Sequence, residues 1–141
     1  MKKAYRVFVY LFLSFFLCSP LWAEVIDINN EELQALMEKG VPLIDMRTPG
    51  EWQSTGVVAG SHKIMSFDER RNIDIDKWVK SIQGLAKPED EVILICRSGN
   101  RTRMLGNYLS SERGYTKVYH LKDGMKGWKK ASLPVIPVKA Y

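Results

Sequence analysis

The sequence predicts an α/β fold in which a parallel central sheet is covered by helices on both faces. The run 92–95 is short, continuous, apolar and rich in β-branched residues, as a strand buried on both faces is. A second run, 41–46, is another buried-strand candidate. Segments with helical spacing alternate with these runs, and that alternation favours a parallel sheet with right-handed crossovers.

The first 23 residues differ from the rest of the chain. A basic start leads into an apolar run, 7–17, and a small residue, Ala23, ends the segment. This pattern is typical of a secretory signal peptide, so we expect residues 1–23 to be removed and residues 24–141 to form one domain, periplasmic or secreted. The apolar run is short for a membrane span of about 20 residues, so only an uncleaved signal would attach the protein to a membrane.

Removal of the signal also lowers the charge of the protein. The formal net charge is +5, and residues 1–23 carry three positive charges and no negative ones, so the charge falls to +2. No basic stripe with interleaved aromatic residues is present, which argues against a nucleic-acid partner. The remaining 118 residues suffice for one hydrophobic core and are too few for two domains of usual size.

Capping signals locate the starts of the helices. Asn29 and Glu32 have the spacing of a capping box, and Thr48 before Pro49 suits the cap and the first position of a second helix. A third helix is expected from Asp76, with its core-facing side chains at Trp78, Val79, Ile82 and Leu85. The other expected elements are strands at 25–28, 62–66 and 118–121, a surface loop at 67–74, and a short helix after 123–124 that holds Trp128.

The stretch 91–104 carries the strongest functional signal. Its apolar strand ends in Cys96, and the polar residues 97–100 suit a tight loop. From Arg101 the spacing predicts a helix whose apolar face comprises Met104, Leu105, Tyr108 and Leu109. A cysteine therefore lies at the carboxyl end of a central strand and below a helix start, where open α/β sheets bind ligands.

The expected surroundings of Cys96 favour its thiolate. Unpaired backbone N–H groups of the loop and the helix dipole point toward the sulfur, and Arg97, Arg101 and Arg103 add positive charge. The thiolate is the nucleophilic form of cysteine, and the same N–H groups suit an anionic substrate. A cysteine ending an apolar strand is often only a small buried hydrophobic residue. The polar loop that follows favours the reactive interpretation.

The cysteine count limits other chemistries. Cys18 leaves with the signal, so the exported chain keeps Cys96 alone and has no intramolecular disulfide. One cysteine and two separated histidines, His62 and His120, are too few for a zinc or iron–sulfur site, so we expect no metal and no cofactor. Because a thiolate needs no base, both histidines are interpreted as ordinary strand or loop residues.

Several motifs follow one another along residues 24–141. They are Asp-Met-Arg-Thr-Pro-Gly-Glu-Trp at 45–52, Gly56 and Gly60, Cys-Arg-Ser-Gly-Asn-Arg at 96–101, Gly-Tyr at 114–115, and Asp-Gly-Met-Lys-Gly-Trp at 123–128. Together they resemble the single-domain rhodanese family. The chain departs from that family at Val57, where a histidine is common, and at Asp123, where a glycine is usual. Neither departure is expected to matter, provided that Gly124 supplies the positive φ.

The resemblance implies a rhodanese-like fold and sulfur transfer through Cys96. In that chemistry the thiolate takes the outer sulfur of a small anionic donor such as thiosulfate and becomes a persulfide. A thiol, cyanide or an acceptor protein then removes the sulfur, which makes the reaction a double displacement. The expected donor-binding residues are Arg97, Ser98, Gly99, Asn100, Arg101 and Thr102, with Arg97 and Arg101 holding the anionic end of the donor.

Asp45 and Arg47 have two interpretations. The carboxylate could orient a loop arginine through a bidentate pair, or the two residues could form a structural ion pair that fixes the strand end. The structural interpretation is favoured. Trp52, Trp78 and Trp128 are expected in the core or in a lid.

Two other functions remain open. A phosphatase or arsenate reductase also uses a thiolate under a loop of N–H groups, but a phosphatase needs Cys-x5-Arg. Here Arg101 gives Cys-x4-Arg and Thr102 stands at the phosphatase position. A rhodanese-like sulfur carrier, or a binding or sensing module without fast turnover, would carry the same motifs.

Overall fold

The computed structural model describes residues 24–140, and the predicted signal peptide lies outside them. Within that part of the chain, none of the helices is both long enough and apolar enough to span a bilayer. The elements are β1 (Ile26–Ile28), α2 (Asn30–Glu38), β2 (Leu43–Asp45), α3 (Pro49–Thr55), β3 (His62–Lys63), α4 (Ile75–Gln83), β4 (Glu91–Ile95), α5 (Asn100–Glu112), β5 (Lys117–Leu121) and α6 (Gly124–Lys130).

The five strands form one parallel sheet in the order β1-β5-β4-β2-β3. β4 lies in the middle, and its last four residues are buried because both neighbouring strands and both helical layers cover them. The predicted parallel α/β fold is confirmed. The central position of β4 places the residue that follows it, Cys96, at the carboxyl edge of the sheet.

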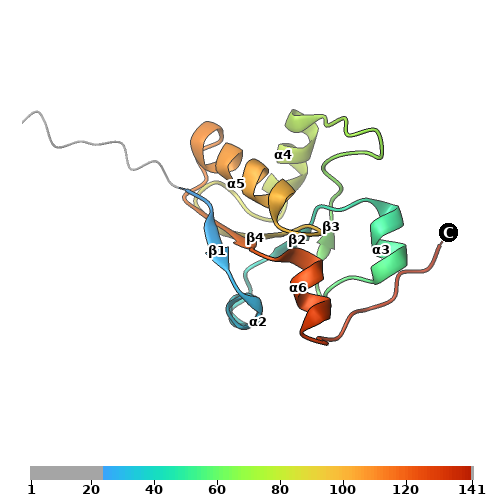
Figure 1. Cartoon of the computed structure of the whole chain (residues 1–141). Helices are drawn as coiled ribbons and strands as arrows, with labels where there is room; N and C mark the ends of the chain where they lie inside the picture. Colours follow the sequence, from blue (N-terminus) through green and yellow to red (C-terminus); the bar gives the residue numbers. More distant parts are fainter. Residues whose placement is uncertain (1–23, 141) are drawn as a thin grey trace, which may run out of the picture.

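Helices cover both faces of the sheet (Figure 1). α4 and α5 pack on one face, in a core that includes Leu94, Leu105 and Cys96. α2 and α6 pack on the other face, around Ile93, Ile95 and Trp128. Since successive side chains of a strand point to opposite faces, the thiol of Cys96 belongs to the α4 and α5 side.

Both predicted caps are present. The Asn29 side chain accepts from the N–H of Glu32 at 2.9 Å, and the Glu32 carboxylate accepts from the N–H of Asn29 at 2.8 Å. At α3, Thr48 and Glu51 form the same reciprocal pair, with Pro49 in the first turn. This second cap has a consequence for function, because it fixes the carboxylate of Glu51 near the carboxyl edge of the sheet.

Four expectations need correction. The third strand is shorter than 62–66: only His62 and Lys63 pair in register with β2, although Ile64 and Ser66 still donate to the carbonyls of Asp45 and Met46 beyond its end. α4 begins at Ile75, because the cap is Asp74 and not a later residue. Leu85 and Met104 were expected in the core, yet they are 41% and 54% exposed. Leu85 follows the end of α4, and Met104 lies on the side of α5 that lines a pocket.

Candidate active site

Cys96 is held in a loop between β4 and α5. Its side chain is 1% exposed. The N–H of Gly99 donates to its sulfur at 3.2 Å, and the hydroxyl of Thr102 lies 3.6 Å from the sulfur. Of the loop N–H groups that were expected around the thiol, the Gly99 N–H is the one that the structure brings within hydrogen-bond distance. The Thr102 hydroxyl supplies the second polar contact.

Two glycines allow this loop to pack tightly. Gly99 caps α5 with φ +87°, and a side chain there would collide with the carbonyl oxygen of Lys122. Gly124 has φ +57°, as predicted for the start of the last helix, and its Cα lies against the backbone of Cys96 and Arg97. The first N–H groups of α6 then bind the loop: Met125 donates to the Cys96 carbonyl at 2.9 Å and Lys126 to the Arg97 carbonyl at 3.0 Å.

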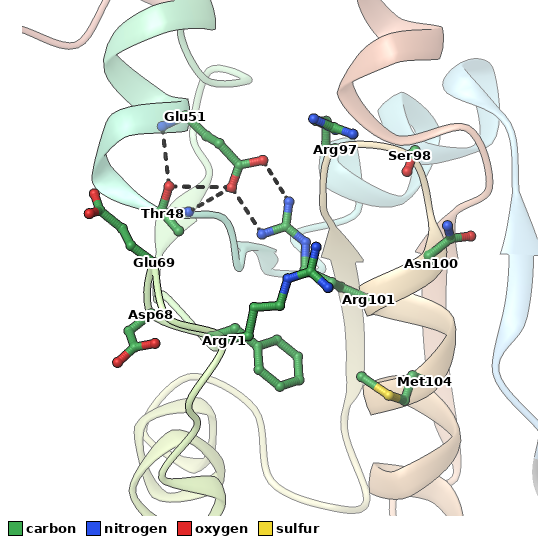
Figure 2. Close-up of a pocket in the computed structure, with 11 residues that line it drawn as sticks. Thr48, Glu51, Asp68, Glu69, Arg71, Arg97, Ser98, Asn100, Arg101 and Met104 are labelled. Carbon is green, nitrogen blue, oxygen red and sulfur yellow. Dashed lines mark hydrogen bonds and ion pairs between the residues drawn. The ribbon is translucent and has the colours of Figure 1, made fainter.

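A pocket of about 650 Å³ opens beside the cysteine loop (Figure 2). The loop and α5 contribute some of its lining, and the 64–74 segment and the start of α3 contribute the rest. The predicted surface loop thus forms one wall of the pocket. The lining residues are Thr48, Glu51, Phe67, Asp68, Glu69, Arg71, Arg97, Ser98, Asn100, Arg101 and Met104.

Arg101 lies in this pocket and is paired with Glu51. Its guanidinium donates to the two carboxylate oxygens at 2.6 and 2.9 Å. Burial lowers the pKa of Arg101, but the hydrogen bond and charge of Glu51, together with the nearby Cys96, outweigh it and raise that pKa. Burial likewise opposes ionisation of Glu51, yet the bonds from Arg101 and the Thr48 N–H keep its pKa below the usual value. A bound donor would therefore have to share Arg101 with a carboxylate.

The other predicted donor-binding residues divide into two groups. Arg97, Ser98 and Asn100 line the pocket, whereas Gly99 and Thr102 lie below it against the thiol. Together with Arg101, all six predicted residues therefore lie around Cys96. Some face the pocket, and others face the thiol. Arg103, which was expected to add charge near the thiol, instead pairs with Asp27 at 3.2 Å.

Asp45 and Arg47 form a buried ion pair on the other face of the sheet. The guanidinium donates to both Asp45 oxygens, at 2.7 and 2.9 Å, and also to the Thr55 hydroxyl and the Gly56 carbonyl. These bonds tie the end of β2 to the end of α3. The loop arginine is instead oriented by Glu51, a residue to which the sequence analysis gave no role beyond its place in the 45–52 motif.

His120 was given no role from the sequence, yet it lies beside the site. Its side chain is fully buried, with Nδ1 3.0 Å from the Thr102 hydroxyl and Nε2 2.7 Å from an oxygen of Asp27. Burial lowers the pKa of His120, and the hydrogen bond to Asp27 offsets only part of that effect. The bond from His120 lowers the pKa of Asp27. The only sequence signal for this histidine was its place in the expected strand 118–121.

Fold and site together define an α/β protein with a thiol at the carboxyl end of the central strand. The loop that holds this thiol leads directly into a helix. The family model described as the Rhodanese-like domain matches residues 29–131. The chain belongs to the rhodanese-like family, and the resemblance seen in its motifs is confirmed.

Individual proteins and a solved structure are also similar to this chain. A thiosulfate sulfurtransferase, GlpE, of Tolumonas auensis is 29% identical over 103 residues, which cover 72% of this chain and 86% of that protein. An uncharacterized protein of Rickettsia conorii is 31% identical over 100 residues, covering 65% and 80%. The polysulfide-sulfur transferase homodimer of Wolinella succinogenes has a similar fold, with a TM-score of 0.62 at 19% identity over 99% of this chain and 93% of that chain.

Proposed function

We propose that the protein is a sulfurtransferase that carries a sulfane sulfur on Cys96, with a small anionic donor such as thiosulfate. The observation that supports this most is the position of the thiol. Cys96 follows the central strand, its sulfur accepts the Gly99 N–H, and the surrounding loop lines an arginine-containing pocket. Membership in the rhodanese-like family and the sulfurtransferases among the relatives support the same reaction class.

The proposed reaction has two displacements. The Cys96 thiolate attacks the outer sulfur of the donor, the sulfur–sulfur bond of the donor breaks, and sulfite leaves with the bonding electron pair. An acceptor nucleophile (cyanide, a thiol or an acceptor protein) then attacks the outer sulfur of the persulfide and returns Cys96 as thiolate. Arg97 and Arg101 are proposed to hold the anionic end of the donor in the first step.

The local geometry favours this proposal over phosphate chemistry. A phosphatase loop needs an arginine at the position of Thr102, and the Thr102 hydroxyl instead lies against the sulfur. The next residue, Arg103, is engaged by Asp27 and does not complete an anion ring. A catalytically slow sulfur carrier is the second candidate, because Cys96 is 1% exposed and access to it is restricted.

The test is intact mass measured before and after incubation with thiosulfate. The protein should gain one sulfur atom and lose it again on addition of cyanide, and Cys96→Ser should gain none while remaining folded. Ser54→Ala is a control at an exposed serine of α3, because it leaves both the thiol and the donor-binding residues in place and should still take up sulfur. No gain on a folded protein with a free thiol would contradict the proposal for this donor.

The rate of cyanide-dependent turnover separates the two candidates. Sulfur uptake followed by rapid thiocyanate release supports an enzyme. Uptake without release to any small acceptor supports a carrier that serves a protein partner.

We also propose that the chain is exported and that residues 1–23 are the signal. Expression of the full chain in a Gram-negative host, followed by fractionation and mass measurement, tests this. A periplasmic product that begins at Glu24 is expected, and a cytoplasmic full-length product would contradict it.

A further inference from the structure

Four side chains form a continuous chain of polar contacts that runs away from the pocket into the protein. The Cys96 sulfur lies 3.6 Å from the Thr102 hydroxyl, which lies 3.0 Å from Nδ1 of His120. Nε2 of His120 lies 2.7 Å from an oxygen of Asp27. The end of β4, α5, β5 and β1 contribute one residue each, and Thr102 and His120 are fully buried.

The sheet register explains why these residues meet. Asp27 of β1 and His120 of β5 are paired in register, and His120 is in turn paired with Leu94 of β4. The side chains of such a row point to the same face, which here is the face covered by α5. The first turn of α5 places Thr102 above this row, between His120 and the thiol.

The protons in this chain can be assigned from donor and acceptor chemistry. An ionised Asp27 only accepts, so Nε2 of a neutral His120 carries the hydrogen and Nδ1 is an acceptor. The Thr102 hydroxyl therefore donates to Nδ1. The Gly99 carbonyl, 3.0 Å from the same hydroxyl, is a competing acceptor, but it also receives the N–H of Arg103, whereas the Thr102 hydroxyl is the donor that lies within reach of Nδ1. The Thr102 oxygen then presents a lone pair to the sulfur.

We propose that Thr102, His120 and Asp27 form a proton relay that ionises the Cys96 thiol. The S–H bond breaks and its proton passes to the Thr102 oxygen, while the hydroxyl proton of Thr102 passes to Nδ1 of His120. The electron pair stays on sulfur. The products are a thiolate that accepts the Thr102 hydroxyl and an imidazolium whose Nε2–H faces the Asp27 carboxylate, so charge and atoms balance without any added reagent.

The charged groups around His120 are compatible with this role. Burial is the largest influence and disfavours a charged imidazole, whereas Asp27 faces His120 from β1 and stabilises the imidazolium. Arg103 of α5, which pairs with the same carboxylate, opposes the imidazolium. Cys96 at the end of β4 supplies the negative partner once it is ionised. His120 and Asp27 act through Thr102 and are positioning residues, while Thr102 itself contacts the reacting sulfur.

The role of the relay in sulfur transfer rests on the proposed function. During donor attack the relay would hold the proton taken from Cys96. After an acceptor has removed the outer sulfur and Cys96 has left as thiolate, the same path would return the proton to it in the resting protein. Ionisation of the thiol can nevertheless be measured without any sulfur donor, so the two proposals can fail separately.

The experiment is the rate of Cys96 alkylation by iodoacetamide, a small neutral probe, as a function of pH. Thr102→Val and His120→Asn should raise the pH of half-maximal alkylation by about one unit. At a pH below that midpoint, each variant should react roughly tenfold more slowly than the wild type. Thr102→Ser keeps the hydroxyl and should restore the wild-type profile. His62→Asn, which replaces the other, exposed histidine, is the matched control and should change nothing.

Thermal unfolding of each variant shows whether it is folded, and nitrogen NMR of His120 in the wild-type protein reports its tautomer. A neutral imidazole protonated at Nε2 supports the relay, and one protonated at Nδ1 overturns it. Identical alkylation profiles for wild type, Thr102→Val and His120→Asn would also overturn it. Shifted profiles in a protein that takes no sulfur from any donor would keep the relay and contradict the proposed function.

Discussion

Two of the arginine–carboxylate pairs in the described part of the chain have similar geometry and opposite surroundings. Asp45 and Arg47 are 0% and 1% exposed, and Arg47 has further bonds to α3. Glu51 and Arg101 are each 25% exposed and face a pocket. The first pair is closed to solvent and fixes two elements to each other. In the proposed reaction a donor anion would replace the carboxylate at Arg101, so the second pair would exchange its partner. The two pairs therefore differ in the exposure of their side chains and not in their geometry, which separates the structural pair from the pair in the candidate site.

The largest expected effect comes from breaking the buried pair. Arg47→Met leaves Asp45 buried without its cation, and we expect a loss of about 3–5 kcal/mol in the free energy of unfolding. Urea unfolding measures it. A double variant with Asp45→Asn should recover part of the loss, because the buried charge is then gone. A loss below about 1 kcal/mol would contradict the scaffold role.

Breaking the pocket pair should affect donor binding more than stability. Arg101→Ala removes a charged hydrogen-bond donor, so KM for thiosulfate should rise by roughly tenfold. Glu51→Gln releases the guanidinium and should lower KM. Steady-state kinetics at fixed ionic strength would show both shifts. If Arg101→Ala changes only the reaction with the acceptor, the assignment of this arginine to the donor is wrong.

A smaller effect is expected from pH. The pKa of Glu51 is held below its usual 4.5, so the pair stabilises the fold above that value. This contribution is lost as the pH falls through the lowered pKa. The difference in unfolding free energy between wild type and Glu51→Gln should therefore shrink in acid. A difference that is constant from neutral to acidic pH would mean that the ion pair contributes nothing.

The smallest effect is expected from an exposed ion pair, against which the two arginine pairs can be compared. Lys117 and Glu91 pair at 3.2 Å, with 57% and 33% of their side chains exposed. Lys117→Ala should change the unfolding free energy by no more than about 0.5 kcal/mol, because solvent screens such a pair. A larger change would indicate that Lys117 has a packing role as well.

Sequence patterns predicted those parts of the fold that depend on neighbours along the chain. The caps at Asn29 and Thr48, the central strand before Cys96 and the turn at Gly124 are all local. Asp45 and Arg47 are two residues apart, so their pairing could also be anticipated.

The remainder depends on contacts between distant segments. Glu51 and Arg101 are 50 residues apart, and His120 and Asp27 are 93 apart, so no periodicity reports either contact. Met104 was misplaced for a related reason. Helical spacing identifies the apolar face of a helix. Which side chains of that face stay exposed, as Met104 does, depends on the loop that packs beside it.

The bonds from α6 to the cysteine loop have a consequence for synthesis of the protein. The carbonyls of Cys96 and Arg97 are oriented by the N–H groups of Met125 and Lys126, which are made about thirty residues later. A nascent chain would lack these donors until α6 had left the ribosome. The thiol would thus take up its final environment only after α6 has been made, well after Cys96 itself.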